Sequence, residues 1–158
     1  MSLIKLLIES DMWYHGTYDY ESFKYNKNKP IFLSKEEYVA KHYAGQGEGF
    51  FDSTNDKGKV FNVEVDFNNY KVKELSAEDY MDILYDGDWK DDWKEFGSSY
   101  ILDIVDPLTE DKNNQLIEKY INEGYDALII EGDQDATPMV DLDYDQIIIF
   151  NHKMITLK

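Results

Sequence analysis

The sequence predicts one α+β domain, and three observations support that prediction. The chain has 158 residues, 42% hydrophobic and 15% aromatic, which suits a single domain with a sizeable core. Residues 61–67 alternate apolar and polar side chains, as in a half-buried strand. Ser34 and Glu37 form a capping box that opens a helix. We expect this domain to span residues 11–158, with residues 1–10 as a short leader or helix.

The amphipathic segment Leu3–Glu9 has two interpretations. It lacks the long apolar core and small-residue cleavage site of a secretory signal, so one interpretation is a short first helix on the domain. The other is a cleaved leader. Leu7-Ile8-Glu9 followed by Ser10 resembles the sites that prohead proteases of T-even-type phages cut in proteins packed inside the capsid.

Apolar runs between polar or turn-forming residues predict the strands of the domain. Asn68 and Asn69 form a turn that leads into the stretch 70–72. The strands are expected at residues 13–16, 31–33, 59–66, 127–130, 138–142, 146–150 and 154–157.

Three segments predict helices. The first is 35–44, which follows the capping box. The second is 76–96, broken around residues 86–88. The third begins at Asp106-Pro107, with Pro in the first turn, and ends at Gly124. An apolar stripe at helical spacing supports the third helix; its members are Leu116, Ile117, Tyr120 and Ile121.

The charge of the chain restricts its partners. The net charge is −17, so we expect repulsion from nucleic-acid phosphates and anionic membranes, and attraction to a basic protein target. Every Lys or Arg position is Lys, so no guanidinium is available to grip phosphate or carboxylate in two places. The absence of Cys excludes disulfides and thiol catalysis, and no stretch has the length of a membrane span.

The stretch Tyr14-His15-Gly16-Thr17 is the first candidate for a ligand-binding motif. Its His supplies a hydrogen-bond donor or acceptor, and its Gly lets a ligand approach main-chain groups. A structural histidine at a strand end is the plain alternative. Two later stretches in the same order along the chain support the binding interpretation.

The second stretch is Ile31–Ser34 followed by a helix that carries Tyr43. The third is Asp145–Asn151, in which an apolar strand follows Gln146. Together the three stretches resemble the ADP-ribosyltransferase family in its His-Tyr-Glu class, to which diphtheria toxin and the poly-ADP-ribose polymerases belong. The step from Phe32 to Tyr43 matches the family spacing, and the family has Glu followed by an apolar strand at the third stretch. The resemblance covers about residues 12–157 and implies a split, two-sheet β core flanked by helices.

The resemblance implies NAD as the substrate that donates ADP-ribose, and it implies a role for each matching residue. Catalytic roles fall to His15, Tyr43 and Gln146. NAD-binding roles fall to Tyr14, His15, Gly16, Thr17, Phe32, Ser34 and Tyr43. Aromatic faces would hold the nicotinamide, and a carboxylate would stabilise the positive charge that develops on the ribose.

The sequence departs from the family pattern at two positions. Phe32 replaces a Tyr and keeps the aromatic face. Gln146 replaces the Glu; an amide can hydrogen-bond ribose but cannot offset a cation or take a proton from an acceptor. Chain-forming polymerase activity is therefore not expected, and the related Arg-Ser-Glu class is excluded because the chain has no Arg. Asp143 and Asp145 are the nearest acids in sequence, although Asp145 would face away from Gln146 on a strand.

No metal site is expected. Residues 141–145 imitate the start of a calcium loop, but Gln146 stands where Gly is needed and His152 where the closing acid is needed.

The resemblance implies a mono-ADP-ribosyltransferase, encoded by a phage or bacterium, that modifies a host protein in the cytoplasm. Two alternatives stay open: an inactive protein of this fold that binds a basic cleft, and an internal head protein packaged in the virion.

Overall fold

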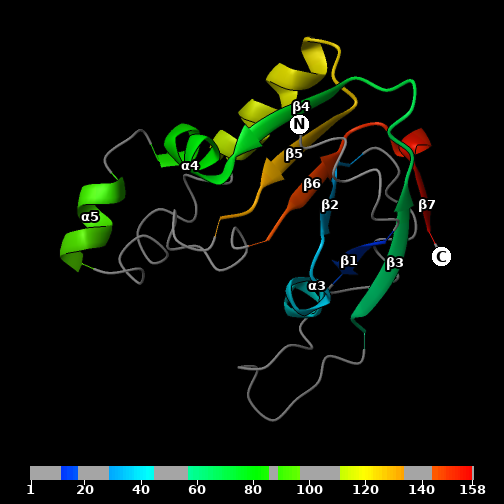
Figure 1. The fold of residues 1–158 in the computed structure, drawn as a ribbon, viewed down its shortest axis with the longest axis horizontal. Helices are drawn as coiled ribbons and strands as arrows, with labels where there is room; N and C mark the ends of the chain where they lie inside the picture. Colours follow the sequence, from blue (N-terminus) through cyan, green and yellow to red (C-terminus); the bar gives the residue numbers. More distant parts are fainter. Residues whose placement is uncertain are drawn as a thin grey trace.

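The computed structural model describes residues 12–17, 29–44, 57–85, 89–96, 111–133 and 144–157. It is an α+β fold built on a curled seven-stranded sheet in the order β4-β5-β6-β2-β1-β3-β7 (Figure 1). All neighbouring strands are antiparallel except β4 and β5. The strands are β1 (Trp13–Thr17), β2 (Ile31–Ser34), β3 (Lys59–Val65), β4 (Val72–Ser76), β5 (Ala127–Glu131), β6 (Gln146–Ile149) and β7 (Ile155–Leu157).

The sheet has a weak line between β1 and β2, which we call the seam. The register between these strands is the single pair Tyr14 with Ser34, whereas β1 pairs with β3 along all five of its residues. One half of the sheet is β4-β5-β6-β2 and the other is β1-β3-β7. The expected pair of separate sheets is therefore one sheet with an interruption.

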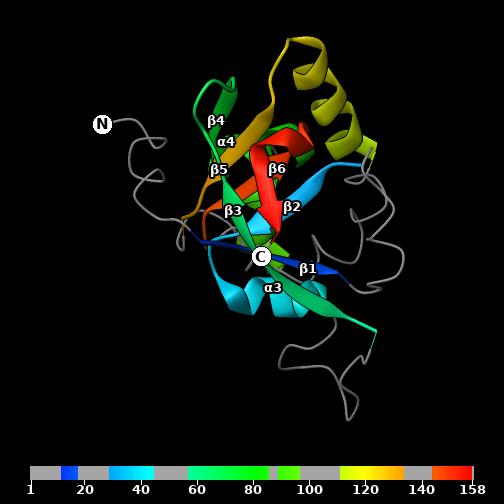
Figure 2. The same cartoon turned by 90° about the vertical axis from the view of Figure 1, so that its right-hand side faces the viewer.

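Among the described residues, four α-helices accompany the sheet: α3 (Glu37–Tyr43), α4 (Ala77–Tyr85), α5 (Trp89–Phe96) and the helix of residues 111–122. Seen from the side, α3 crosses close to β1 and β3, away from the helix of residues 111–122 (Figure 2). Ser76 caps α4 by accepting a hydrogen bond at Oγ from the Asp79 N–H, 3.0 Å away. Gly124 has a φ of 88° and ends the helix of residues 111–122, as the sequence predicts.

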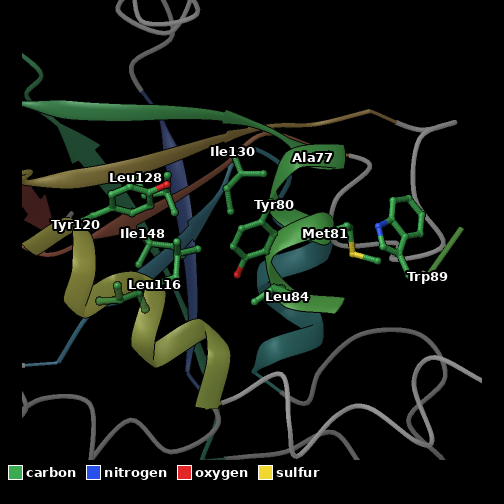
Figure 3. Packing of buried hydrophobic residues seen from close by; sticks show 11 residues of the cluster. Ala77, Tyr80, Met81, Leu84, Trp89, Leu116, Tyr120, Leu128, Ile130 and Ile148 are labelled. Atoms are coloured by element: carbon green, nitrogen blue, oxygen red, sulfur yellow. The ribbon is translucent and has the colours of Figure 1, made fainter. Parts of the chain in front are cut away.

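Apolar side chains pack on both faces of the sheet. On one face α4 and the helix of residues 111–122 cover Leu128, Ile130 and Ile148, and Trp89 extends the cluster beside Met81 (Figure 3). The other face buries Trp13, which has no exposed surface. The rest of the second cluster comes from four strands and the segment before β7: Ile31, Leu33, Phe61, Val63, Ala127, Ile129, Ile147, Ile149 and Met154. Both faces are buried because the central strands are continuous apolar runs.

Asp126 joins the ends of three strands. Its backbone N–H donates to the Lys71 carbonyl, and its carboxylate accepts from the Lys71 N–H, at 2.7 and 2.9 Å. The other carboxylate oxygen accepts from the Asn151 side-chain amide at 3.0 Å. These bonds fix the start of β4, the start of β5 and the end of β6 to one another.

Several predicted boundaries differ from the structure. The first helix begins at Glu37 instead of residue 35, because Ser34 Oγ accepts from the Glu36 N–H in a turn that precedes the helix. β3 and β6 each end one residue early, and β7 begins at Ile155, since Met154 belongs to a short 3-10 helix. β4 runs from residue 72 to 76, beyond the predicted stretch 70–72. Residues 1–10, 86–88, 106–107 and 138–142 lie outside the described residues.

Candidate functional site

His15 links the two halves of the sheet across the seam. Its Nδ1 lies 2.7 Å from the carbonyl oxygen of Phe32, so the Nδ1–H donates to this acceptor. In the neutral ring this bond makes Nε2 the acceptor nitrogen. The ring also stacks on Phe61, its cross-strand partner, at 6.4 Å between centroids. Burial lowers the pKa of His15 below its usual 6.5, and the bond to Phe32 partly opposes that shift.

Gly16 provides the close contact between β1 and α3. A Cβ built on Gly16 would overlap the backbone carbonyl of Ala40 in α3. Only a residue without a side chain lets this helix lie so near the strand. The space beside Gly16 that the sequence assigned to a ligand is thus occupied by α3 on the side where a Cβ would point.

Tyr14, Ser34 and Gln146 form a cross-strand row at the seam. Tyr14 pairs with Ser34, and Ser34 pairs with Gln146, so the three side chains share one face of the sheet. Ser34 and Gln146 are only 4% and 7% exposed, and they are the buried polar residues of the described part of the chain. Gln146 therefore presents its amide in an environment where hydrogen bonds are strong.

Phe32 and Tyr43 have exposed aromatic surface, Phe32 on β2 at the seam and Tyr43 at the end of α3. Phe32 is 38% exposed and Tyr43, the last residue of α3, is 45% exposed. Large apolar side chains with this much exposure are available to a flat ligand. Thr17, which was also predicted to bind NAD, is the last residue of β1 and lies opposite Lys59.

The structure brings some predicted site residues together and separates others. Tyr14, Ser34 and Gln146 share a face. His15 follows Tyr14 on β1, so its side chain points to the opposite face, toward Phe61. His15 and Gln146 can thus reach a common ligand only at the seam itself, where the sheet is interrupted. The register between the strands sets this arrangement, and the sequence motifs do not reveal it.

Asp145 has a structural task. One carboxylate oxygen accepts from the Gly132 N–H at 2.8 Å, and the Asp145 carbonyl accepts from the Lys35 N–H at 2.9 Å. A Cβ on Gly132 would overlap the Tyr144 backbone, so these segments are in close contact. Asp145 holds the start of β6 against the ends of β5 and β2 and thereby fixes Gln146. Asp143 lies outside the described residues.

Two residues of this region were not identified as site residues from sequence. Phe61 was expected only as a core residue of β3, and Lys59 only as the strand's first position. Each lies opposite a residue of the first motif, Phe61 opposite His15 and Lys59 opposite Thr17. The pairing of β1 with β3 is the signal that would have identified them.

Within the described ranges, no group of three or more His, Cys, Asp and Glu side chains could hold a metal ion. The helices of that same part of the chain include none long and apolar enough to cross a membrane.

Comparison of the chain with protein-family models found no match. Comparisons with curated proteins and with solved structures found none either.

Proposed function

We propose that this protein is a mono-ADP-ribosyltransferase of the His-Tyr-Glu type that transfers ADP-ribose from NAD to a basic protein target, as a phage-encoded or bacterial protein acting in the host cytoplasm. One observation carries the proposal: the His15 ring bonds across the interrupted sheet to the carbonyl of Phe32, whose own side chain is exposed, as is that of Tyr43 at the end of α3. The fold class and the three motifs in order support it.

Each residue has a task in this proposal. Phe32 and Tyr43 offer aromatic faces to the nicotinamide. His15, held by its Nδ1–H bond to Phe32, directs Nε2 as an acceptor toward a ribose hydroxyl. The bond between nicotinamide and ribose breaks with its electron pair going to nicotinamide, and a nucleophile of the target protein then bonds to the ribose carbon and releases its proton to water.

Gln146 is the residue of the proposed site that is least suited to the reaction. Its buried amide can orient ribose hydroxyls but leaves the developing positive charge without a compensating anion. Asp145 does not replace it, because its carboxylate already accepts the Gly132 N–H. We therefore expect slow turnover in the natural sequence.

The test measures nicotinamide release from NAD by wild type, Gln146→Glu and His15→Ala. Gln146→Glu should raise turnover at least about tenfold, a barrier change of about 1.4 kcal/mol. His15→Ala should weaken NAD binding and remove turnover. Labelled NAD with host lysate should label a protein band. The matched control is Glu64→Gln, which replaces an exposed acid on β3 and should leave nicotinamide release as in wild type.

Background release from all three proteins, together with no NAD binding by calorimetry, would contradict the proposal. It would favour a second candidate, an acidic binding module that keeps the fold without catalysis, or a packaged internal head protein. Gln146 and the net charge of −17 are the observations that favour these alternatives.

A further inference from the structure

Lys59 lies next to His15 on the same face of β3 and β1. His15 pairs with Phe61 and Thr17 pairs with Lys59, so these four side chains form two adjacent cross-strand pairs. The Lys59 Nζ lies 4.9 Å from the centroid of the Phe61 ring, and His15 stacks on the same ring. A cation and an imidazole thus approach one aromatic side chain on β3, the strand next to β1.

A positive charge at this position has a consequence for anionic ligands. The chain carries a net charge of −17, so an approaching anion is repelled unless a local cation offsets the field. Lys35 also reaches the face of β1 that carries His15, since its Nζ lies 5.1 Å from the centroid of the Trp13 ring and Trp13 lies two residues before His15. Lys59 differs from Lys35 because its Nζ approaches Phe61, the ring on which His15 stacks.

We propose that Lys59 binds the diphosphate of NAD while His15 contacts the adjoining ribose. This inference rests on the proposed function and names the part of the substrate that this face of the sheet takes. The Lys59 Nζ lies over the Phe61 ring, 4.9 Å from its centroid, and an ammonium is a point charge that suits phosphate oxygens. Phe61 is only 7% exposed, so it forms a rigid base for this side chain.

The experiment measures dissociation constants by calorimetry for three ligands: NAD, ADP-ribose and nicotinamide. The proteins are wild type, Lys59→Gln, Lys59→Arg and the control Lys73→Gln. Lys73 also lies near aromatic rings, those of Tyr120 and Tyr125, but on β4 at the edge of the other half of the sheet. Thermal unfolding of each variant checks that the fold is intact.

Lys59→Gln should raise the dissociation constants of NAD and ADP-ribose about tenfold and leave that of nicotinamide unchanged. Lys59→Arg should keep near wild-type affinity because it retains the charge. Lys73→Gln should match wild type for every ligand. The affinity of wild type for NAD should also fall more steeply with added salt than that of Lys59→Gln.

Two results would overturn the inference while the proposed function stands. One is wild-type NAD affinity in Lys59→Gln; the other is an equal loss of nicotinamide affinity, which would mean that Lys59 only supports the structure. A wild-type protein that binds neither NAD nor ADP-ribose would instead contradict the proposed function, and the inference would fall with it.

Discussion

At the scale of single residues, His15 couples protonation to stability. Burial holds its folded-state pKa below the ordinary 6.5, so the unfolded chain binds the proton more readily than the folded protein does. The stabilisation is complete above pH 6.5 and is lost as the pH falls from 6.5 toward the lower folded-state value.

The variant that tests this coupling is His15→Asn, whose side-chain amide can still donate to the Phe32 carbonyl. Its free energy of unfolding should depend less on pH than that of wild type below pH 6.5, and the two curves should run parallel above it. Urea unfolding at a series of pH values measures the free energy of unfolding of wild type and of His15→Asn. His42 and His152 are present in both proteins and cancel in the comparison. Parallel curves over the whole range would show that His15 does not titrate differently on folding.

The first motif, Tyr14 to Thr17, shows how much of a site a local sequence pattern can predict. The sequence singled out His15 and Gly16, and both occupy special positions. The reason for Gly16 came from the structure, since the need for a missing side chain arises from Ala40 in α3. A contact between a strand and a helix 24 positions apart depends on tertiary packing, which local patterns do not encode.

At the scale of elements, Asp126 holds β4, β5 and β6 in place. Asp126→Ala removes the acceptor for the Lys71 N–H and for the Asn151 amide. Hydrogen bonds to charged groups contribute about 1.5–3 kcal/mol each, so we expect a loss of at least about 2 kcal/mol in the free energy of unfolding. Urea unfolding measures it.

Asp66→Ala is the matched control for this prediction. Its carboxylate accepts one hydrogen bond, from the Asn68 N–H at 2.9 Å, in an exposed turn. We expect a loss of about 1 kcal/mol or less. Equal losses in the two variants would mean that Asp126 contributes no more than an ordinary turn residue.

The elements themselves were largely readable from sequence. Alternation identified β3, apolar runs identified β5 and β6, and the stop at Gly124 was placed correctly. The order of the strands was not readable, because it is set by pairings between residues far apart in the chain, such as Ser34 with Gln146. For the same reason the sequence could not place His15 and Gln146 on different faces.

At the scale of the whole molecule, the net charge of −17 destabilises the folded state through repulsion between carboxylates. Raising NaCl from about 0.05 to about 0.5 M shortens the screening length several-fold and should raise the melting temperature. Calorimetry or circular dichroism measures the melting temperature at each salt concentration. KCl should act equally, because screening depends on ionic strength; a rise specific to one cation would indicate ion binding instead.

The order in which the chain visits the two halves of the sheet has a consequence for folding. β1 lies in one half, β2 in the other, β3 in the first again, then β4 to β6 in the second, and β7 returns to the first. No continuous piece of chain builds either half, and the last strand pairs with Val63, Glu64 and Val65 from the middle of the sequence. Ring closure over such distances is slow, so folding should wait for distant segments to meet. The seam has a single register pair, fewer than any other pairing in the sheet. The chain nevertheless passes from one half of the sheet to the other several times, so the two halves should fold and unfold together as one cooperative unit.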